Sequence, residues 1–215
     1  MNRFVIVAGL CSAVFASSTA LAQDAAETSA PGVHEHDGFY LRFGLGLGYM
    51  AGKEKPEQGS GDADVTGFGI PVELAFGGTP APGLVIGGGS FGMYVPSPKL
   101  KSNGNEADGG ALTISGIGPF VDYYLDPNGG AHFGGALLLA SIGVSEKDSA
   151  PKGSGIGFGG AIFGGYEMWI GDQWSVGVIG RVAYYNAKVT FDAPGDPKNT
   201  ISGITPAVLL GFTYH

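Results

Sequence analysis

The sequence predicts an all-β protein, an antiparallel up-and-down barrel of eight strands that spans a membrane and follows a cleaved signal peptide. Three observations predict it: apolar residues alternate with small ones at a period of two, short and long connections alternate, and few charges fall within the predicted strands. The composition agrees, because 41 of 215 residues are glycine and only 14% are charged. Average proteins have about 7% glycine and about 25% charged residues.

The first 22 residues have the form of a secretory signal peptide. Arg3 supplies a positive start, an apolar stretch follows, and small residues precede a cleavage site after Ala22. Cys11 is the only cysteine, so the processed chain has no disulfide and no thiol chemistry. We expect a signal peptide over 1–22, an acidic and flexible N-terminal tail over 23–37, and a barrel domain over 38–215.

Strands are predicted wherever apolar and small residues alternate. In the first run, Phe39, Leu41 and Phe43 share one face, and Arg42 lies on the other face with several glycines. Glu73 has the same relation to its apolar neighbours in the second run. The alternation leaves open which faces of the third and fourth runs point inward. The predicted strands are 39–49, 65–76, 84–95, 111–125, 131–144, 156–170, 174–185 and 201–214.

The connections between these strands alternate in length. Short turns are predicted at 77–83, 126–130 and 171–173, and longer polar loops at 51–64, 96–110, 145–155 and 186–200. An even number of strands, with short turns at one end and long loops at the other, is typical of outer-membrane barrels. We therefore expect the long loops to be extracellular, and the short turns and the N-terminal tail to lie in the periplasm.

A soluble eight-stranded barrel of the lipocalin kind is the alternative architecture. Such a barrel needs a polar outer wall. Here the large apolar residues lie opposite glycine and alanine, and a wall so poor in charge suits lipid better than water. The charged residues within the predicted strands are Arg42, Glu73, Asp122, Glu167 and Arg181.

These five charges form the candidate site, a charge network in the lumen. Arg42 and Glu73 point inward from neighbouring strands, so we expect them to pair. Asp122, Glu167 and Arg181 should complete the network, because a lone buried charge is costly. The network is either a polar plug that stabilises the barrel or a selectivity ring for solutes. The interior of an eight-stranded barrel is just filled by its side chains, which favours the plug.

Aromatic residues gather near both ends of the predicted strands. Aromatic rings prefer the interface between lipid and water, so two such belts indicate two membrane surfaces. The predicted girdle consists of Phe39, Phe76, Tyr123, Trp169, Trp174 and Tyr214 beside the short turns, and of Tyr49 and Tyr184 toward the long loops.

With these features the chain resembles the small eight-stranded outer-membrane barrels of Gram-negative bacteria, of the OmpA and OmpX type. The resemblance covers the signal peptide and nearly all of residues 38–215. The last strand resembles the C-terminal signal read by the barrel-assembly machinery, through Val208, Leu210, Phe212 and Tyr214; His215 then follows where the family usually ends in Phe. The resemblance implies a monomer in contact with outer-membrane lipids, assembled by that machinery.

Other motifs offer little chemistry. Residues 155–160 spell a dinucleotide fingerprint, but no helix is predicted after them. His34 and His36 could hold a metal loosely, yet histidines of a mobile tail are more often solvated and lack orienting partners. The loop aspartates lack the ligand spacing of a calcium site. We predict no metal and no cofactor, and the absence of a basic stripe argues against nucleic acid.

An enzyme is considered because some barrels of this size modify outer-membrane lipids. The deacylases among them use a His-x-Ser pair, which this sequence lacks. Without a histidine to activate a serine, hydrolysis loses its base, so we predict that the protein is not an enzyme. The expected role is structural or surface interaction in the cell envelope. The alternative is a narrow channel for small or apolar solutes, and the specific partner or solute cannot be predicted.

Overall fold

The structure, a computed structural model, describes residues 34–57, 61–146 and 151–215. The predicted signal peptide and most of the predicted tail lie outside these residues. Among the described residues, no helix is long and apolar enough to cross a membrane. The strands are β1 (Gly38–Pro56), β2 (Ala63–Ala81), β3 (Leu84–Val95), β4 (Lys99–Ser102), β5 (Asn105–Asp108), β6 (Leu112–Tyr124), β7 (Ala131–Val144), β8 (Gly153–Trp169), β9 (Trp174–Phe191) and β10 (Lys198–Tyr214).

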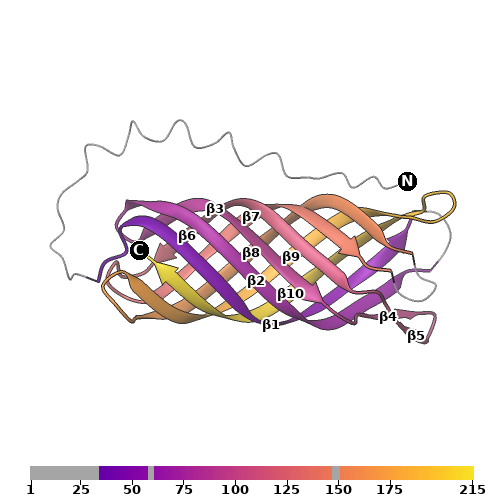
Figure 1. Cartoon of the computed structure of the whole chain (residues 1–215), viewed down its shortest axis with the longest axis horizontal. Coiled ribbons are helices and arrows are strands. Elements are labelled where there is room, and N and C mark those ends of the chain that lie inside the picture. Colours follow the sequence, from indigo (N-terminus) through magenta and orange to yellow (C-terminus); the bar gives the residue numbers. More distant parts are fainter. Residues whose placement is uncertain (1–33, 58–60, 147–150) are drawn as a thin grey trace. The chain divides into compact units, whose positions relative to one another are not determined.

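Eight of these strands close into a ring. The order is β1-β10-β9-β8-β7-β6-β3-β2, and β1 also pairs with β2 (Figure 1). Leu41 of β1 therefore lies opposite both Tyr214 of β10 and Phe76 of β2. The predicted fold, an antiparallel up-and-down barrel of eight strands, is confirmed. We call the end with the connections 82–83, 125–130 and 170–173 the turn end, and the opposite end the loop end.

The strands extend further toward the loop end than the sequence predicts. The predicted loop 51–64 is mostly strand, because β1 continues to Pro56 and β2 begins at Ala63. Polar side chains face each other across these extensions: Lys53 Nζ lies 2.9 Å from Asp64 Oδ1 in the β1–β2 ladder. The loop predictions for 145–155 and 186–200 are also too long. The apolar alternation ends where the strand residues become polar. A prediction based on it therefore makes these strands too short.

The predicted loop 96–110 contains a hairpin, formed by β4 and β5. The hairpin turns at Asn103 and Gly104, which both have positive φ values of 51° and 81°. An Asn-Gly pair of this kind makes a tight two-residue turn. Leu100 of β4 pairs with Val65 of β2, so the hairpin continues the sheet beyond the ring. The longer polar loop predicted over 96–110 therefore contains two short strands.

The lumen is filled, and glycine makes room for its large side chains. A Cβ on Gly134 would lie 2.7 Å from the ring of Phe163, and one on Gly211 would lie 2.7 Å from Ile179 Cδ1. Both partners are buried. Large residues thus occupy space that the facing glycines leave free. This pairing accounts for part of the glycine content, since an eight-stranded barrel has little interior volume.

Replacing Gly134 by alanine is expected to destabilise the barrel by about 1–3 kcal/mol, the usual cost of overpacking. The new methyl group would collide with Phe163 and with the Val121 carbonyl oxygen. Gly143, on the same strand, has no atom within 4 Å of an added Cβ, so Gly143→Ala is the matched control. Urea unfolding in detergent micelles measures both, and equal stability of the two variants would contradict the packing argument.

The outer wall of the ring is apolar. Leu47, Phe68 and Leu137 are 76%, 80% and 75% exposed, as expected for side chains that face lipid. The structure shows which side chains of the third and fourth predicted strands, β3 and β6, point inward. In β3, Phe91 and Met93 are buried while Ile86 and Tyr94 face outward, and in β6 the inward residues include Asp122.

Candidate functional site in the barrel lumen

The five strand charges all point into the lumen, where their side chains are buried. Arg42 lies at the centre. Its Nε and Nη2 are 2.8 and 2.7 Å from Glu73 Oε1, and its Nη1 is 2.6 Å from Asp122 Oδ2. Glu73 also accepts a bond of 3.0 Å from Arg181 Nη1, and Arg181 Nη2 donates to the Gly92 carbonyl. Four of the five predicted charges thus form one connected group.

Aromatic rings line this group of charges. The Arg42 guanidinium lies 4.7 Å from the centre of the Phe163 ring, and the Arg181 guanidinium lies 6.0 Å from that of Phe91. Cations at such distances are attracted by the ring faces. The rings also exclude water from the ion pairs, so each charge depends on its protein partners.

Glu167, the fifth charge, lies nearer the turn end and is held by hydroxyl groups. It accepts hydrogen bonds from Ser175 (2.7 Å), Thr213 (2.7 Å) and Tyr124 (3.2 Å). His132 connects it to the central group, because His132 Nδ1 lies 2.9 Å from Asp122 and Nε2 lies 3.8 Å from Glu167. Charges and hydroxyls therefore form a chain from the barrel centre toward the turn end.

Sequence reasoning missed His132 and the hydroxyl partners of Glu167. A signal for them was present, because the alternation places each on the inward face. His132 has the same parity as the buried Ala136 and Leu138 on β7. What the alternation cannot show is which inward residues meet across the lumen.

The turn-end mouth is closed by residues that the sequence places in a flexible tail. His36 is fully buried, and its Nδ1 lies 3.0 Å from Nδ1 of His215. Burial, with His215 nearby, lowers the pKa of His36 from 6.5 to about 4. Residues 34–36, which the sequence places in a flexible tail, are therefore bound to the barrel in the structure, and His36 is not a solvated side chain. Within the described residues, no three acidic, histidine or cysteine side chains are arranged to hold a metal.

One residue of the predicted girdle also belongs to this mouth. Trp169 pairs with Ser175 in the β8–β9 ladder and shares its inward parity. Its ring stacks on His36 at 4.9 Å and lies 5.1 Å from that of His215. Assigning Trp169 to an outward girdle is therefore wrong. The alternation along β8 places Trp169 on the inward face. Its position at the end of the strand does not show this by itself.

The other girdle residues lie on the outer face. Trp174 and Tyr214 contact each other at the turn end with ring centres 5.2 Å apart, and Phe39 lies 6.4 Å from Tyr214. Toward the loop end, Tyr49 lies 5.1 Å from Phe68. The remaining members, Phe76, Tyr123 and Tyr184, are exposed. On β10, Val208, Leu210 and Phe212 of the predicted assembly signal are exposed, and Tyr214 is half-buried.

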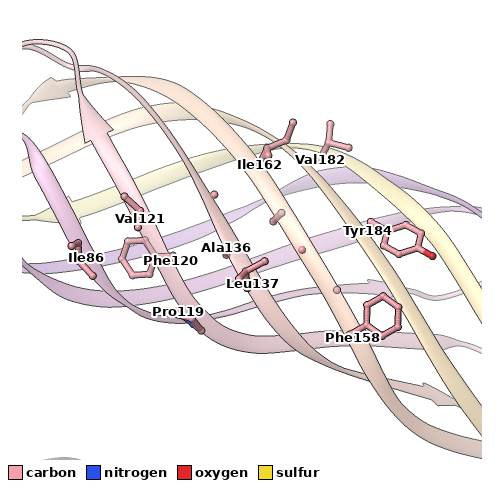
Figure 2. A pocket seen from close by; sticks show the side chains of 14 residues that line it. Ile86, Pro119, Phe120, Val121, Ala136, Leu137, Phe158, Ile162, Val182 and Tyr184 are labelled. Carbon is pink, nitrogen blue, oxygen red and sulfur yellow. The ribbon is translucent and has the colours of Figure 1, made fainter.

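Apolar hollows are also present outside the charge network. A groove of about 760 Å³ on the outer wall is lined by residues of β3, β6, β7, β8 and β9, including Leu137, Phe158 and Tyr184 (Figure 2). It passes Pro119, which cannot donate to the β6–β7 ladder. A smaller cavity of about 280 Å³ lies at the loop end.

Ser175, His215 and Glu167 lie close together, but they are not arranged as a hydrolytic triad. Ser175 Oγ is 3.3 Å from His215 Nε2, and Glu167 is 3.6 Å from the same nitrogen. In a triad the acid binds the other ring nitrogen and so orients the base. Here the acid accepts the serine proton directly, and Ser175 is buried. The three residues form a structural hydrogen-bond cluster.

Comparison with known proteins identifies the fold. No protein-family model matches the chain, and no curated protein matches it. Among solved structures, the outer membrane protein OprG from Pseudomonas aeruginosa matches with a TM-score of 0.55 at 12% identity, over 85% of this chain and 99% of OprG. The chain has the fold of the small eight-stranded outer-membrane β-barrels.

Two further barrels of this class support the assignment. Neisserial surface protein A has a TM-score of 0.51 at 16% identity, over 82% of this chain and 96% of its own. The outer membrane protein AlkL, solved in lipid bilayers, has a TM-score of 0.51 at 16% identity, over 86% and 93%. At these identities the likeness concerns the fold alone, so the function of this outer-membrane barrel has to be argued from its own residues.

Proposed function

We propose that this protein is a non-enzymatic integral outer-membrane barrel with a sealed lumen and a structural or surface-interaction role in the cell envelope. In this proposal the loop end faces the outside and the turn end faces the periplasm. The polar strand extensions and the β4–β5 hairpin then form the surface on which an extracellular partner would bind.

The observation that carries the proposal is the ion-pair network across the lumen. Arg42 contacts acids from two other strands, and Arg181 reaches Glu73 from a fourth. The pairs therefore link β1, β2, β6 and β9 through the interior. Because these side chains have no exposed surface, they leave no aqueous passage at this level. A barrel with a sealed lumen can serve the envelope as a rigid structural element and through its exposed loop-end surface.

We expect the unmodified protein to show no large, steady, porin-like conductance in planar bilayers. Purified protein is reconstituted, and current is recorded at several voltages beside a general porin as positive control. Steady porin-like current would refute the sealed lumen and promote the solute-channel function.

The loop-end cavity favours a second candidate function, the uptake of small apolar solutes. Buried Val65, Leu112 and Ile201 line it, and Leu100 of the hairpin contributes to its wall. Glu54 and Asn199 form a hydrogen-bonded polar pair in the same lining. A lining of this kind suits a small molecule with an apolar body.

Filling the cavity tests this second candidate. Val65→Phe places a ring where the solute would bind, and it is expected to abolish any gain in uptake of a radiolabelled aromatic hydrocarbon by cells that express the barrel. Phe68→Leu, on the outer face of the same strand, is the control and should keep the uptake. Equal uptake in cells with and without the protein would exclude the candidate.

A further inference from the structure

The segment before β1 lies across the turn-end mouth and is bound mainly by the β6–β7 turn. The His36 N–H donates to the Pro127 carbonyl at 2.9 Å, and His36 Nε2 lies 2.7 Å from the Gly129 carbonyl oxygen. Asn128 Nδ2 donates to the His34 carbonyl at 2.7 Å. Three bonds thus tie residues 34–36 to one turn nearly a hundred positions away in the chain.

The ring of His36 fills the mouth. It stacks on Tyr124 at 3.6 Å and on Trp169 at 4.9 Å, and it meets His215 edge-on at 4.1 Å. His34 stacks on the same tryptophan at 5.1 Å. With no exposed surface, the His36 side chain acts as a stopper between the periplasmic side and Glu167.

The burial and the contacts of His36 favour an uncharged ring. A carbonyl oxygen only accepts, so His36 Nε2 carries the proton that it donates to Gly129. The lone pair of the neutral ring is then on Nδ1, which lies 3.0 Å from Nδ1 and 3.1 Å from Nε2 of His215. A proton added to Nδ1 would put a positive charge on a buried ring that lies against a second histidine, which is costly.

Titratable and polar groups from several elements surround the stopper. Glu167 on β8 is the acid of the mouth, and its oxygens already accept bonds from three hydroxyl groups. The surrounding groups are Tyr40 on β1, Tyr124 on β6, His132 on β7, Ser175 on β9 and His215 after β10, with Glu35 and Asp37 on the segment itself. Of these, His132 and His215 disfavour a proton on His36, while Glu167 favours one.

We propose that residues 34–37 form an acid-released latch over the periplasmic mouth of the barrel, with His36 as its stopper. At neutral pH the uncharged ring holds the segment in place. In acid the segment leaves the mouth and water reaches Glu167 and His215. The ion pairs around Arg42 lie deeper and stay in place, so release opens the mouth without unfolding the barrel.

The direction follows from the two states of His36. The pKa of about 4 in the docked state is below the ordinary value of 6.5, so the released segment binds the proton more tightly. Docking is therefore strongest above about pH 6.5 and weakens as the pH falls toward 4. A difference of this size shifts the equilibrium toward release by about 10²-fold between pH 7.5 and pH 4, since each pKa unit corresponds to a factor of ten.

Hydrogen exchange of the full-length barrel in detergent micelles tests the latch. Exchange of residues 34–40 is measured at pH 7.5 and pH 4 and corrected for the intrinsic rate at each pH. We expect protection to fall by about 10²-fold in acid while the strands around Arg42 stay protected. Equal corrected protection at both pH values would overturn the proposal, as would loss of protection throughout the barrel.

Two variants attribute the effect to His36. His36→Phe keeps a ring against Tyr124 but cannot be protonated, so its protection should not change with pH. His34→Phe is the control and should keep the pH dependence. A pH response that survives in His36→Phe would contradict the role of His36. A direct NMR titration of the His36 ring needs no variant, and a midpoint near 6.5 in the intact barrel would also overturn the latch.

Discussion

Replacing Arg42 by alanine is expected to lower the free energy of unfolding by about 3–5 kcal/mol, the usual cost of removing one partner of a buried ion pair. Among the residues that the structure describes, the variant leaves Asp122 in contact with His132 and Tyr40, and Glu73 in contact with Arg181. Neither acid can gain a water shell, because both are buried. Urea unfolding in micelles, followed by the gel shift between folded and boiled protein, measures the loss.

A double mutant separates lost attraction from the cost of uncompensated charge. Arg42→Ala with Glu73→Ala should be more stable than the sum of the two single losses predicts, because residues in contact are not additive. The recovery will be partial, since Glu73 also binds Arg181. Lys53→Ala, which breaks an exposed pair at the loop end, is the control and should change little. An Arg42→Ala loss as small as that of the control would show that the lumen is wet.

The second large effect is expected at Glu167. Glu167→Ala leaves the hydroxyl groups of Ser175, Thr213 and Tyr124 without their acceptor, and we expect a loss of about 3 kcal/mol. Glu167→Gln keeps one acceptor oxygen and the side-chain shape, so roughly half of that loss is expected. The same unfolding assay compares them.

The contrast between these two variants distinguishes bonding from space filling. If Glu167 only fills volume, the glutamine variant will be as stable as the unmodified protein. If the hydroxyl cluster is unimportant, alanine and glutamine will both be tolerated. Either result would contradict the view that Glu167 connects β6, β8, β9 and β10 inside the barrel.

The two halves of the polar chain have different tasks in this view. The ion pairs around Arg42 seal the centre of the lumen. The rings of His36, Trp169 and His215 close the turn-end mouth. Mutations at Arg42 should therefore act on stability at every pH at which the acids are ionised, whereas mutations at His36 should act on the mouth and its response to acid.

The sequence by itself determined the barrel and the inward direction of its charges. Strand side chains alternate strictly, so Arg42 and Glu73 had to share the lumen once the apolar partners of each were assigned to the lipid. Consecutive strands of an up-and-down barrel are neighbours, and each of the two residues lies three positions from the turn end of its predicted strand, so they lie on adjacent strands at similar depth. The two-residue alternation and the lengths of the connections are local properties of the sequence. They could therefore be predicted from the sequence alone.

Only the tertiary structure decided how the mouth is closed. His36 and His215 meet although 179 positions separate them, and Trp169 turns inward to stack on His36. No local pattern marks such a contact, because it arises from ring closure between β1 and β10. The strand ends at the loop side were likewise visible only in the structure, because β1 and β2 stay paired through polar residues such as Lys53 and Asp64 where the apolar signal has already ended.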